Sequence, residues 1–240
     1  MSAEGTPPLS LVVPAYNEER RLGPGLDRML ASLEGRPGEV IVVDDGSRDG
    51  TREIACRRAA QDSRIRVVGL DVNQGKGAAV AAGMRAARGD WILCTDTDLS
   101  TPLSELARLE RYRDSAEVII GSRALPDSDL QVRQPLRREN LGRAFNHAVR
   151  LAALYGIYDT QCGFKLWSRR AAHAVFPRMR IRRFAFDVEA LWLARRLGFR
   201  IREVGVLWKH DPATTVRVFR DGMRMGGDLL RVLGWRVLGR

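Results

Sequence analysis

Residues 39–61 read EVIVVDDGSRDGTREIACRRAAQ and combine two patterns in one short stretch. Residues 39–47 are a continuous β-branched run that ends in two aspartates, a glycine and a serine. Residues 48–61 then form a helix-like run, with apolar side chains at 54–56 and 59–60 among charged ones. An apolar run without alternation is typical of a strand covered on both faces. The stretch therefore predicts a strand–helix unit with polar residues at the carboxyl end of the strand.

The same unit recurs through the first half of the chain. The other strand-like runs are 9–16, 64–71, 90–98 and 116–123, and helix-like runs occupy 17–33, 75–89 and 101–113. Repeated strand–helix–strand units imply a parallel sheet with right-handed crossovers. We expect an α/β fold with a mostly parallel sheet flanked by helices.

The second half is less regular. It predicts a loop at 124–136, a basic amphipathic helix at 137–155, a short strand at 163–167, helices at 168–176 and 186–197, a strand at 199–208 and a basic amphipathic helix at 213–240. The sequence has no internal repeat or low-complexity segment, and no clean domain boundary is visible.

Polar residues cluster where the predicted strands end, at 16–18, 44–47, 71–76, 96–101 and 121–123. In open α/β sheets, ligands bind outside the carboxyl ends of the strands. Within the segment CTDTDLSTP (94–102), Asp96 and Asp98 are two residues apart and can face one point if the chain is extended. Two such carboxylates repel each other unless a cation or a proton lies between them. The alternative is a helix N-cap, which would account for Ser100 or Thr101 better than for Asp96.

The segment NQGKGAAVAAG (73–83) matches neither common phosphate-binding motif. Leu70 stands where a P-loop begins with glycine, and Gly77 replaces the Ser or Thr that follows the lysine. Val80 breaks the dinucleotide-binding pattern. Two readings stay open: a tight turn into an Ala-rich helix, or a backbone that approaches a phosphate or sugar together with Lys76.

Composition limits the possible classes of protein. The 240 residues are 45% hydrophobic and 29% charged, which is ordinary for a soluble globular protein, and no apolar run is long enough to cross a bilayer. We expect no signal peptide, and we expect the three cysteines to be reduced in a cytoplasmic protein. Residues 1–120 carry 16 Lys and Arg against 19 Asp and Glu, whereas residues 121–240 carry 24 against 10. The basic half could face phosphates, an anionic membrane or nucleic acid; the absence of a nucleic-acid-binding motif and the acidic strand ends argue against nucleic acid.

Six segments together resemble the inverting GT-A-fold glycosyltransferases, and most of all the polyprenyl-phosphate (dolichyl-phosphate) β-glucosyltransferases and mannosyltransferases. They are VVPAYNEE (12–19), VVDDGSRDGT (42–51), NQGKGAAVAAGM (73–84), DTDLSTP (96–102), GSR (121–123) and DTQCGFKLW (159–167). The resemblance implies a Rossmann-like GT-A domain at 9–212, after a disordered 1–8 and before the basic amphipathic helix at 213–240.

The resemblance also implies roles for individual residues. Those expected to bind the nucleotide are Pro14, Ala15, Tyr16, Glu18, Asp44, Asp45, Gly75, Lys76, Asp96 and Thr97. Asp96 and Asp98 are expected to hold Mg²⁺ or Mn²⁺ on the donor diphosphate. Those expected to bind the sugar or the acceptor phosphate are Arg123, Arg133, Arg137, Asp159, Gln161 and Lys165, with Arg138 as a further candidate. Lys76, Arg123 and Asp187 are the expected catalytic residues, and Glu189 is the second choice for the acid that faces the acceptor.

The expected reaction moves a hexose from a nucleotide sugar to a polyprenyl phosphate, with inversion at the anomeric carbon. UDP-glucose is the preferred donor and GDP-mannose the rival. A soluble hydroxyl acceptor is the other alternative, and it would need Asp187 as general base. Helices 137–155 and 213–240 are expected to contact an anionic membrane surface, which would make the protein peripheral at the inner face of a membrane.

Overall fold

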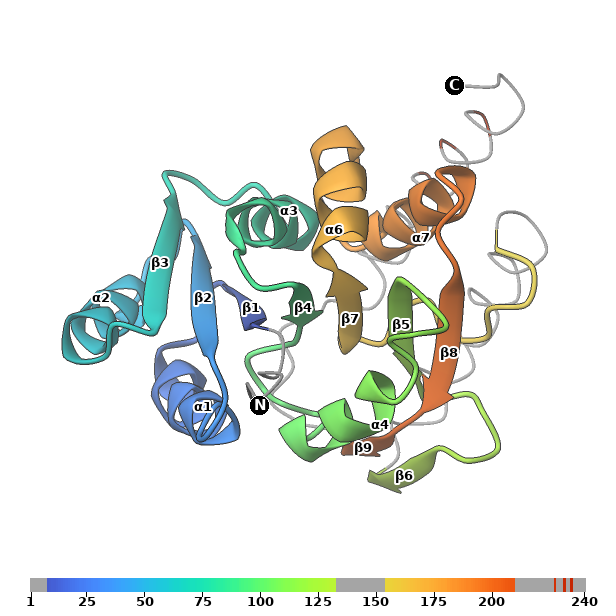
Figure 1. Cartoon of the computed structure of the whole chain (residues 1–240). Coiled ribbons are helices and arrows are strands. Elements are labelled where there is room, and N and C mark those ends of the chain that lie inside the picture. Colours follow the sequence, from blue (N-terminus) through green and yellow to red (C-terminus); the bar gives the residue numbers. More distant parts are fainter. Residues whose placement is uncertain (1–7, 133–153, 210–226, 228–230, 232–233, 235–240) are drawn as a thin grey trace, which may run out of the picture.

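The computed structural model describes residues 8–132 and 154–209, together with residues 227, 231 and 234. Within these residues the main sheet has seven strands in the order β3-β2-β1-β4-β7-β5-β8 (Figure 1). Their bounds are Leu9–Ala15 (β1), Gly38–Asp45 (β2), Ile65–Leu70 (β3), Trp91–Cys94 (β4), Val118–Ser122 (β5), Lys165–Ser168 (β7) and Ile201–Gly205 (β8). The predicted α/β fold with a mostly parallel sheet is confirmed.

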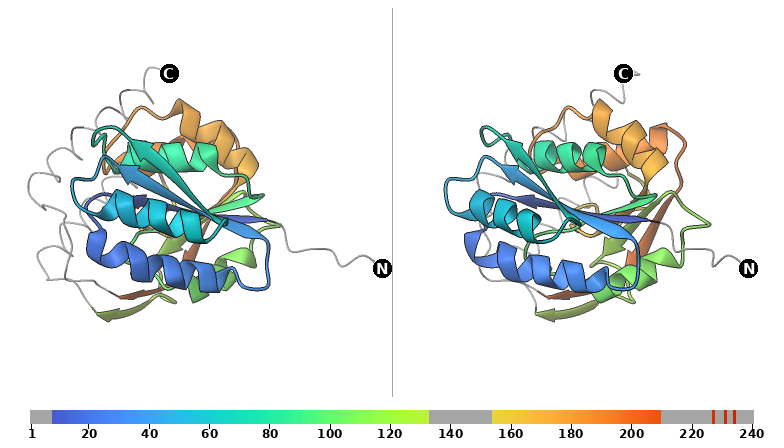
Figure 2. Two further views of the ribbon diagram at one scale, coloured as in Figure 1. Left: turned by 90° about the vertical axis from the view of Figure 1, so that its left-hand side faces the viewer. Right: turned by 60° about the vertical axis from the view of Figure 1, so that its left-hand side comes forward.

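Helices cover both faces of this sheet (Figure 2). One face carries α1 (Glu19–Ser32), α2 (Thr51–Gln61), the 3₁₀ turn η1 (Leu103–Glu105) and α4 (Leu106–Glu110). The other carries α3 (Lys76–Ala86), α6 (Arg169–Val175), η2 (Phe176–Arg178) and α7 (Phe186–Arg196). The strands are apolar throughout because successive side chains enter different cores: Val12 packs with α3, while Leu11 and Val13 pack with α1.

The strand order reverses between β1 and β4, and this reversal positions the site. The chain builds β1, β2 and β3 outward in one direction and then returns to place β4 on the other side of β1. The loops that follow β1 and β4 therefore diverge and leave a crevice at the carboxyl ends of these strands. Asp96 and Asp98 follow β4 directly, so they lie at this crevice.

Strand β7 runs antiparallel to both of its neighbours, β4 and β5. Lys165 is in register with Cys94 on one side and with Ile120 on the other. The start of β7 thus lies beside the carboxyl ends of β4 and β5, and the segment 159–165 reaches the crevice from the opposite chain direction.

The structure differs from the sequence-based expectations in two segments. Residues 129–132, expected within a loop, form strand β6 (Asp129–Val132), which pairs with β9 (Leu207–Lys209) in a second, two-stranded sheet. The helix expected over 101–113 is only the 3₁₀ turn η1 followed by the short α4. Both elements are short. Strand β6 forms because Asp129 and its neighbours pair with the backbone of β9 and of Val206, which follow β8 in the chain.

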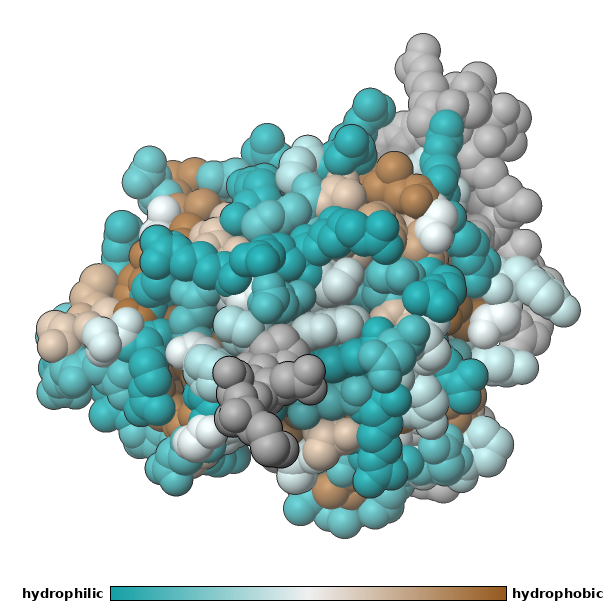
Figure 3. Space-filling model, viewed as in Figure 1, coloured by the Kyte–Doolittle hydropathy of each residue, from teal (hydrophilic) through white to brown (hydrophobic). Residues whose placement is uncertain are grey.

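The predicted helices at 137–155 and 213–240 fall almost wholly outside the described residues, as do Arg133, Arg137 and Arg138. Among the residues that are described, no helix combines the length and the apolar character needed to cross a membrane. Figure 3 shows that one face of the molecule is mainly hydrophilic, with apolar residues in small separate groups.

Candidate active site

A small pocket at the crevice is lined by two acids, two lysines and a group of apolar side chains. The charged groups are Lys76 at the start of α3, Asp96 after β4, Lys165 on β7 and Asp187 on α7. The apolar side chains include Val80, Trp167, Phe176 and Phe186. Four elements that are far apart in the sequence thus place alternating charges around one space.

Asp96 is held between a lysine and a glycine. Its Oδ1 lies 2.6 Å from Nζ of Lys76, and both side chains are about one-third exposed at most. Its Oδ2 lies against the backbone of Gly163, where any Cβ would overlap the carboxylate. A side chain at position 163 would therefore push Asp96 away from the pocket. The sequence analysis did not single out Gly163, although it lies inside a segment that carried the resemblance.

The rest of the aspartate loop is a turn with Leu99 in the left-handed region, at φ 49°. The backbone N–H of Ser100 donates to Oδ1 of Asp98 at 2.9 Å. Burial, together with the charge of Asp96, raises the pKa of Asp98. The Thr97 hydroxyl donates to the Pro14 carbonyl oxygen at 3.0 Å, so Thr97 joins the loop to β1 rather than facing the pocket.

These two carboxylates suit a divalent cation with incomplete protein ligation. Among the described residues, no group of three or more His, Cys, Asp or Glu side chains could hold a metal by itself. Mg²⁺ is typically bound by one or two carboxylates plus substrate phosphates and water. Burial is the main cause of the raised pKa of Asp98, and the charge of Asp96 adds to it; a cation shared by both carboxylates would offset this repulsion.

The second ion pair joins Lys165 to Asp187. Nζ of Lys165 lies 2.5 Å from Oδ1 of Asp187 and donates to the Cys162 carbonyl oxygen at the same distance. Burial raises the pKa of Asp187, and the charges of Lys165 and Lys76 oppose that rise. Cys94 also lines the pocket, but burial raises the pKa of its thiol to about 12, so it is a neutral group near pH 7.

Glu189, the second choice for the acceptor-facing acid, is engaged elsewhere. It is 1% exposed and accepts hydrogen bonds from the backbone N–H groups of Arg180 (2.9 Å) and Ile181 (2.7 Å). It therefore stabilises the segment before α7. Of the two acids, only Asp187 lines the pocket.

The adjacent aspartates Asp44 and Asp45 differ in their hydrogen bonding. Both oxygens of Asp45 are used by the glycine loop: the Asn73 amide donates at 2.9 Å, the Gln74 N–H at 2.7 Å and the Gly75 N–H at 2.9 Å. Asp44 accepts only from the Ser47 N–H, at 3.2 Å, and its buried Oδ2 has no partner among the described residues. Asp45 thus fixes the loop, whereas Asp44 keeps one buried oxygen that has no partner among the described residues.

The glycine loop lies under a basic segment that the sequence analysis missed. Gly75 has φ 102°, and a Cβ there would overlap the Arg182 carbonyl oxygen. That carbonyl also accepts from the Ala78 N–H at 3.0 Å, and a Cβ at Gly77 would meet the Ile181 carbonyl oxygen. Both glycines are therefore needed for close packing at the start of α3, which fits the reading of a tight turn into the helix. The other reading, a backbone that approaches a phosphate or sugar, stays a prediction. Nothing in the basic run 180–183 indicated that it would lie here.

Arg123 pairs with Asp159, whose side chain is buried, while that of Arg123 is about one-quarter exposed. Nε and Nη2 of Arg123 donate to the Asp159 carboxylate at 2.7 and 2.9 Å, and its guanidinium lies 5.5 Å from the centre of the Trp208 ring. Burial opposes ionisation of Asp159, but the Arg123 charge outweighs it and lowers the pKa to about 2. The pair fixes the segment 159–165 against β5. That Arg123 also offers its charge to an acceptor phosphate stays a prediction.

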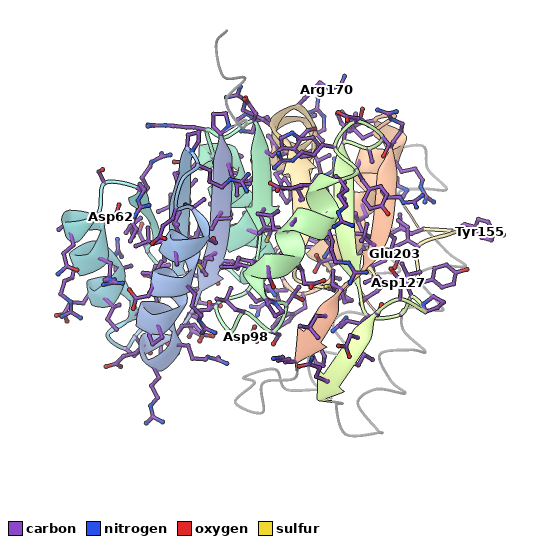
Figure 4. The ribbon with its side chains drawn as sticks, turned by 60° about the horizontal axis from the view of Figure 1, so that its bottom comes forward. Asp62, Asp98, Asp127, Tyr155, Arg170 and Glu203 are labelled. Carbon is purple, nitrogen blue, oxygen red and sulfur yellow. The ribbon has the colours of Figure 1, made fainter. Side chains whose placement is uncertain are left out.

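The remaining expected residues lie around the same edge of the sheet. Pro14 and Ala15 end β1, Tyr16 is exposed, and Glu18 forms two hydrogen bonds with Arg21 at 2.7 and 2.9 Å. The amide nitrogen of Gln161 is buried and has no partner in the described part of the chain. Figure 4 shows Asp98 at the edge of the sheet opposite to Arg170, which follows the carboxyl end of the antiparallel β7.

Comparison with known proteins gives consistent matches. Residues 10–176 match the sequence profile described as Glycosyl transferase family 2. A dolichyl-phosphate beta-glucosyltransferase of Trichomonas vaginalis is 39% identical, with 93% of this chain and 70% of the relative covered. The human dolichyl-phosphate beta-glucosyltransferase is 37% identical, with 94% and 74% covered. A crystal structure of Mycobacterium tuberculosis glucosyl-3-phosphoglycerate synthase, with Mn²⁺, UDP-glucose and phosphoglyceric acid, has TM-score 0.72 at 21% identity, over 95% of this chain and 80% of that one.

Proposed function

Because the chain belongs to glycosyl transferase family 2, we propose that it transfers glucose from UDP-glucose to a polyprenyl phosphate such as dolichyl phosphate. The observation that carries this proposal is the match, over nearly the whole chain, to curated dolichyl-phosphate beta-glucosyltransferases. The chain is a glycosyltransferase, and the donor, the acceptor and the metal are the proposed parts.

Asp96 and Asp98 would hold the Mg²⁺ or Mn²⁺ that accompanies the donor diphosphate. The mutual repulsion of these carboxylates and their place at the crevice support this assignment. A structure of similar fold that contains Mn²⁺ and UDP-glucose is consistent with it. When bound, such a cation neutralises the charge that develops on the departing diphosphate.

The protein's own groups bind and orient the nucleotide. Asp44 supplies a buried carboxylate oxygen that can accept a hydrogen bond from the base or ribose. Asp45 holds the glycine loop in place, and Lys76 at the start of α3 presents an ammonium to the phosphates. Arg123 and Asp159 act as positioning residues, since their pair fixes the segment that carries Gly163 and Lys165.

The acceptor phosphate attacks the anomeric carbon from the face opposite the diphosphate, which inverts the configuration. A phosphate monoester is already ionised near neutral pH, so this acceptor requires no strong base. Asp187 then positions the acceptor. Part of the acceptor site is expected from Arg133 and Arg137, which lie outside the described residues.

The proposal has two alternatives, one for the donor and one for the acceptor. GDP-mannose is the alternative donor. A soluble hydroxyl acceptor is favoured by one observation: burial raises the pKa of Asp187, as suits a general base. Contact with an anionic membrane surface is also proposed, on the strength of the 24 basic against 10 acidic residues in residues 121–240.

One assay separates these possibilities. The protein is incubated with labelled UDP-glucose or labelled GDP-mannose, together with a short polyprenyl phosphate and a set of soluble hydroxyl acceptors. We expect label in the lipid fraction from UDP-glucose only. Label in the lipid from GDP-mannose would change the donor, and transfer only to a soluble acceptor would overturn the lipid assignment.

A further inference from the structure

The pocket uses lysine in a chain that otherwise uses arginine. The sequence contains 37 arginines and three lysines, Lys76, Lys165 and Lys209, and the first two line this one pocket. A lysine ammonium is a compact point charge on a flexible stem, whereas the arginine guanidinium is a planar fork. The ammonium groups of Lys76 and Lys165 are therefore closer in shape to a metal cation than an arginine guanidinium would be.

Lys76 lies where a cation on Asp96 would lie. Its Nζ is 2.6 Å from Oδ1 of Asp96, while Gly163 closes off the side of Oδ2. Oδ2 of Asp96 already fills the space that a Cβ at position 163 would take. A second cation can then reach Asp96 fully only if Lys76 moves.

We propose that Lys76 is an internal counter-cation that occupies Asp96 until a divalent cation displaces it. This inference rests on the proposed metal site. Asp96 keeps a positive partner in both states, so it is never left as an unpaired charge in a half-buried pocket. The released ammonium remains in the pocket, where Asp187 and the incoming phosphates provide negative charge.

The competition has a measurable consequence. Metal binding to the protein without nucleotide is weakened by the need to break the Lys76–Asp96 pair. Lys76→Met removes the competitor and leaves both aspartates in place, so it should bind Mn²⁺ up to about fivefold tighter, the scale of a partly exposed ion pair. Lys209→Met is the matched control: the Lys209 N–H donates to the Ser100 carbonyl oxygen at 2.8 Å, so this lysine starts beside the aspartate loop, but its side chain is exposed.

The test follows Mn²⁺ binding and lysine reactivity in the same samples. Bound Mn²⁺ is measured by electron paramagnetic resonance, and each lysine is labelled with an amine-reactive reagent and quantified by mass spectrometry. In the wild-type protein without nucleotide, labelling of Lys76 should rise in step with bound Mn²⁺, while labelling of Lys209 stays constant. This measurement needs no variant, so it does not depend on whether Lys76→Met folds.

The outcomes distinguish this inference from the proposed function. Bound Mn²⁺ with unchanged Lys76 labelling would overturn the counter-cation role and leave the metal site standing. An equal gain in Mn²⁺ affinity in Lys76→Met and Lys209→Met would also overturn it, because loss of any nearby positive charge would then explain the gain. No Mn²⁺ binding with or without UDP would contradict the metal site itself, and the inference with it.

Discussion

At the scale of single residues, the site is decided by which polar groups already have partners. The sequence predicted that Asp44 and Asp45 lie at the end of a strand, but it could not distinguish them. In the structure, both carboxylate oxygens of Asp45 accept hydrogen bonds from the glycine loop. Oδ2 of Asp44 has no hydrogen-bond partner among the described residues. Arg123 and Asp159 were likewise predicted separately, and their pairing could not be predicted because 36 residues separate them.

The aspartate pair gives the first residue-scale prediction. Asp96→Ala and Asp98→Ala should each lower turnover by more than about 100-fold, because a metal ion supplies several kcal/mol of charge stabilisation. Turnover is measured across a Mn²⁺ titration, with Asp71→Ala as the control, since Asp71 is an exposed carboxylate in another strand-end cluster. Metal-dependent turnover that survives either substitution would refute the proposed ligands.

The ion pair between Arg123 and the buried Asp159 predicts a pH-dependent stability. The pKa of Asp159 falls from 3.8 to about 2 in the folded protein, so the pair contributes about 2 kcal/mol above pH 4 and loses it as the pH falls toward 2. Asp159→Asn should therefore lower the free energy of unfolding by about that amount at pH 7, and by progressively less below pH 4, in denaturant titrations.

Asp62 supplies the control for this experiment. Its pKa is also lowered to about 2, mainly by its hydrogen bond with Arg64, but this pair lies at the surface on the outer flank of the molecule (Figure 4). Solvent screens such a pair, so Asp62→Asn should cost less than about 1 kcal/mol. Equal losses in the two variants would show that burial of Asp159 does not matter.

At the scale of elements, the strand–helix units and their polar ends were predictable because each is encoded locally. The direction of β7 was not, because the sequence of a four-residue strand such as KLWS reads the same in a parallel or an antiparallel strand. Its direction matters, since it brings Gly163 against Asp96. The small β6–β9 sheet was missed because β6 is short and its partner lies far along the chain.

The close approach of the segment before β7 gives an element-scale prediction. Gly163→Ala should displace Asp96 and weaken Mn²⁺ binding in the presence of UDP at least tenfold, with both aspartates still present. Gly23→Ala is the matched control, because nothing lies near a Cβ at that position in α1 and alanine favours a helix. Unchanged Mn²⁺ binding in Gly163→Ala would show that the contact does not position Asp96.

At the scale of the whole molecule, the uneven distribution of charge predicts contact with an anionic membrane, which the described residues do not test. The positive excess of residues 121–240 predicts binding to anionic vesicles at low salt and release at high salt, because screening weakens attraction to lipid headgroups. Flotation with phosphatidylserine vesicles, compared with neutral phosphatidylcholine vesicles, measures this directly. Equal recovery from the two kinds of vesicle at low salt would exclude electrostatic attraction to the membrane.

The most direct test of the account is a crystal of the protein with UDP and Mn²⁺, in which anomalous scattering locates the metal. We predict one strong peak within coordination distance of the carboxylates of Asp96 and Asp98, about 2 Å away, with the UDP diphosphate completing its ligands. A peak elsewhere, or ordered UDP without any metal peak, would contradict the account.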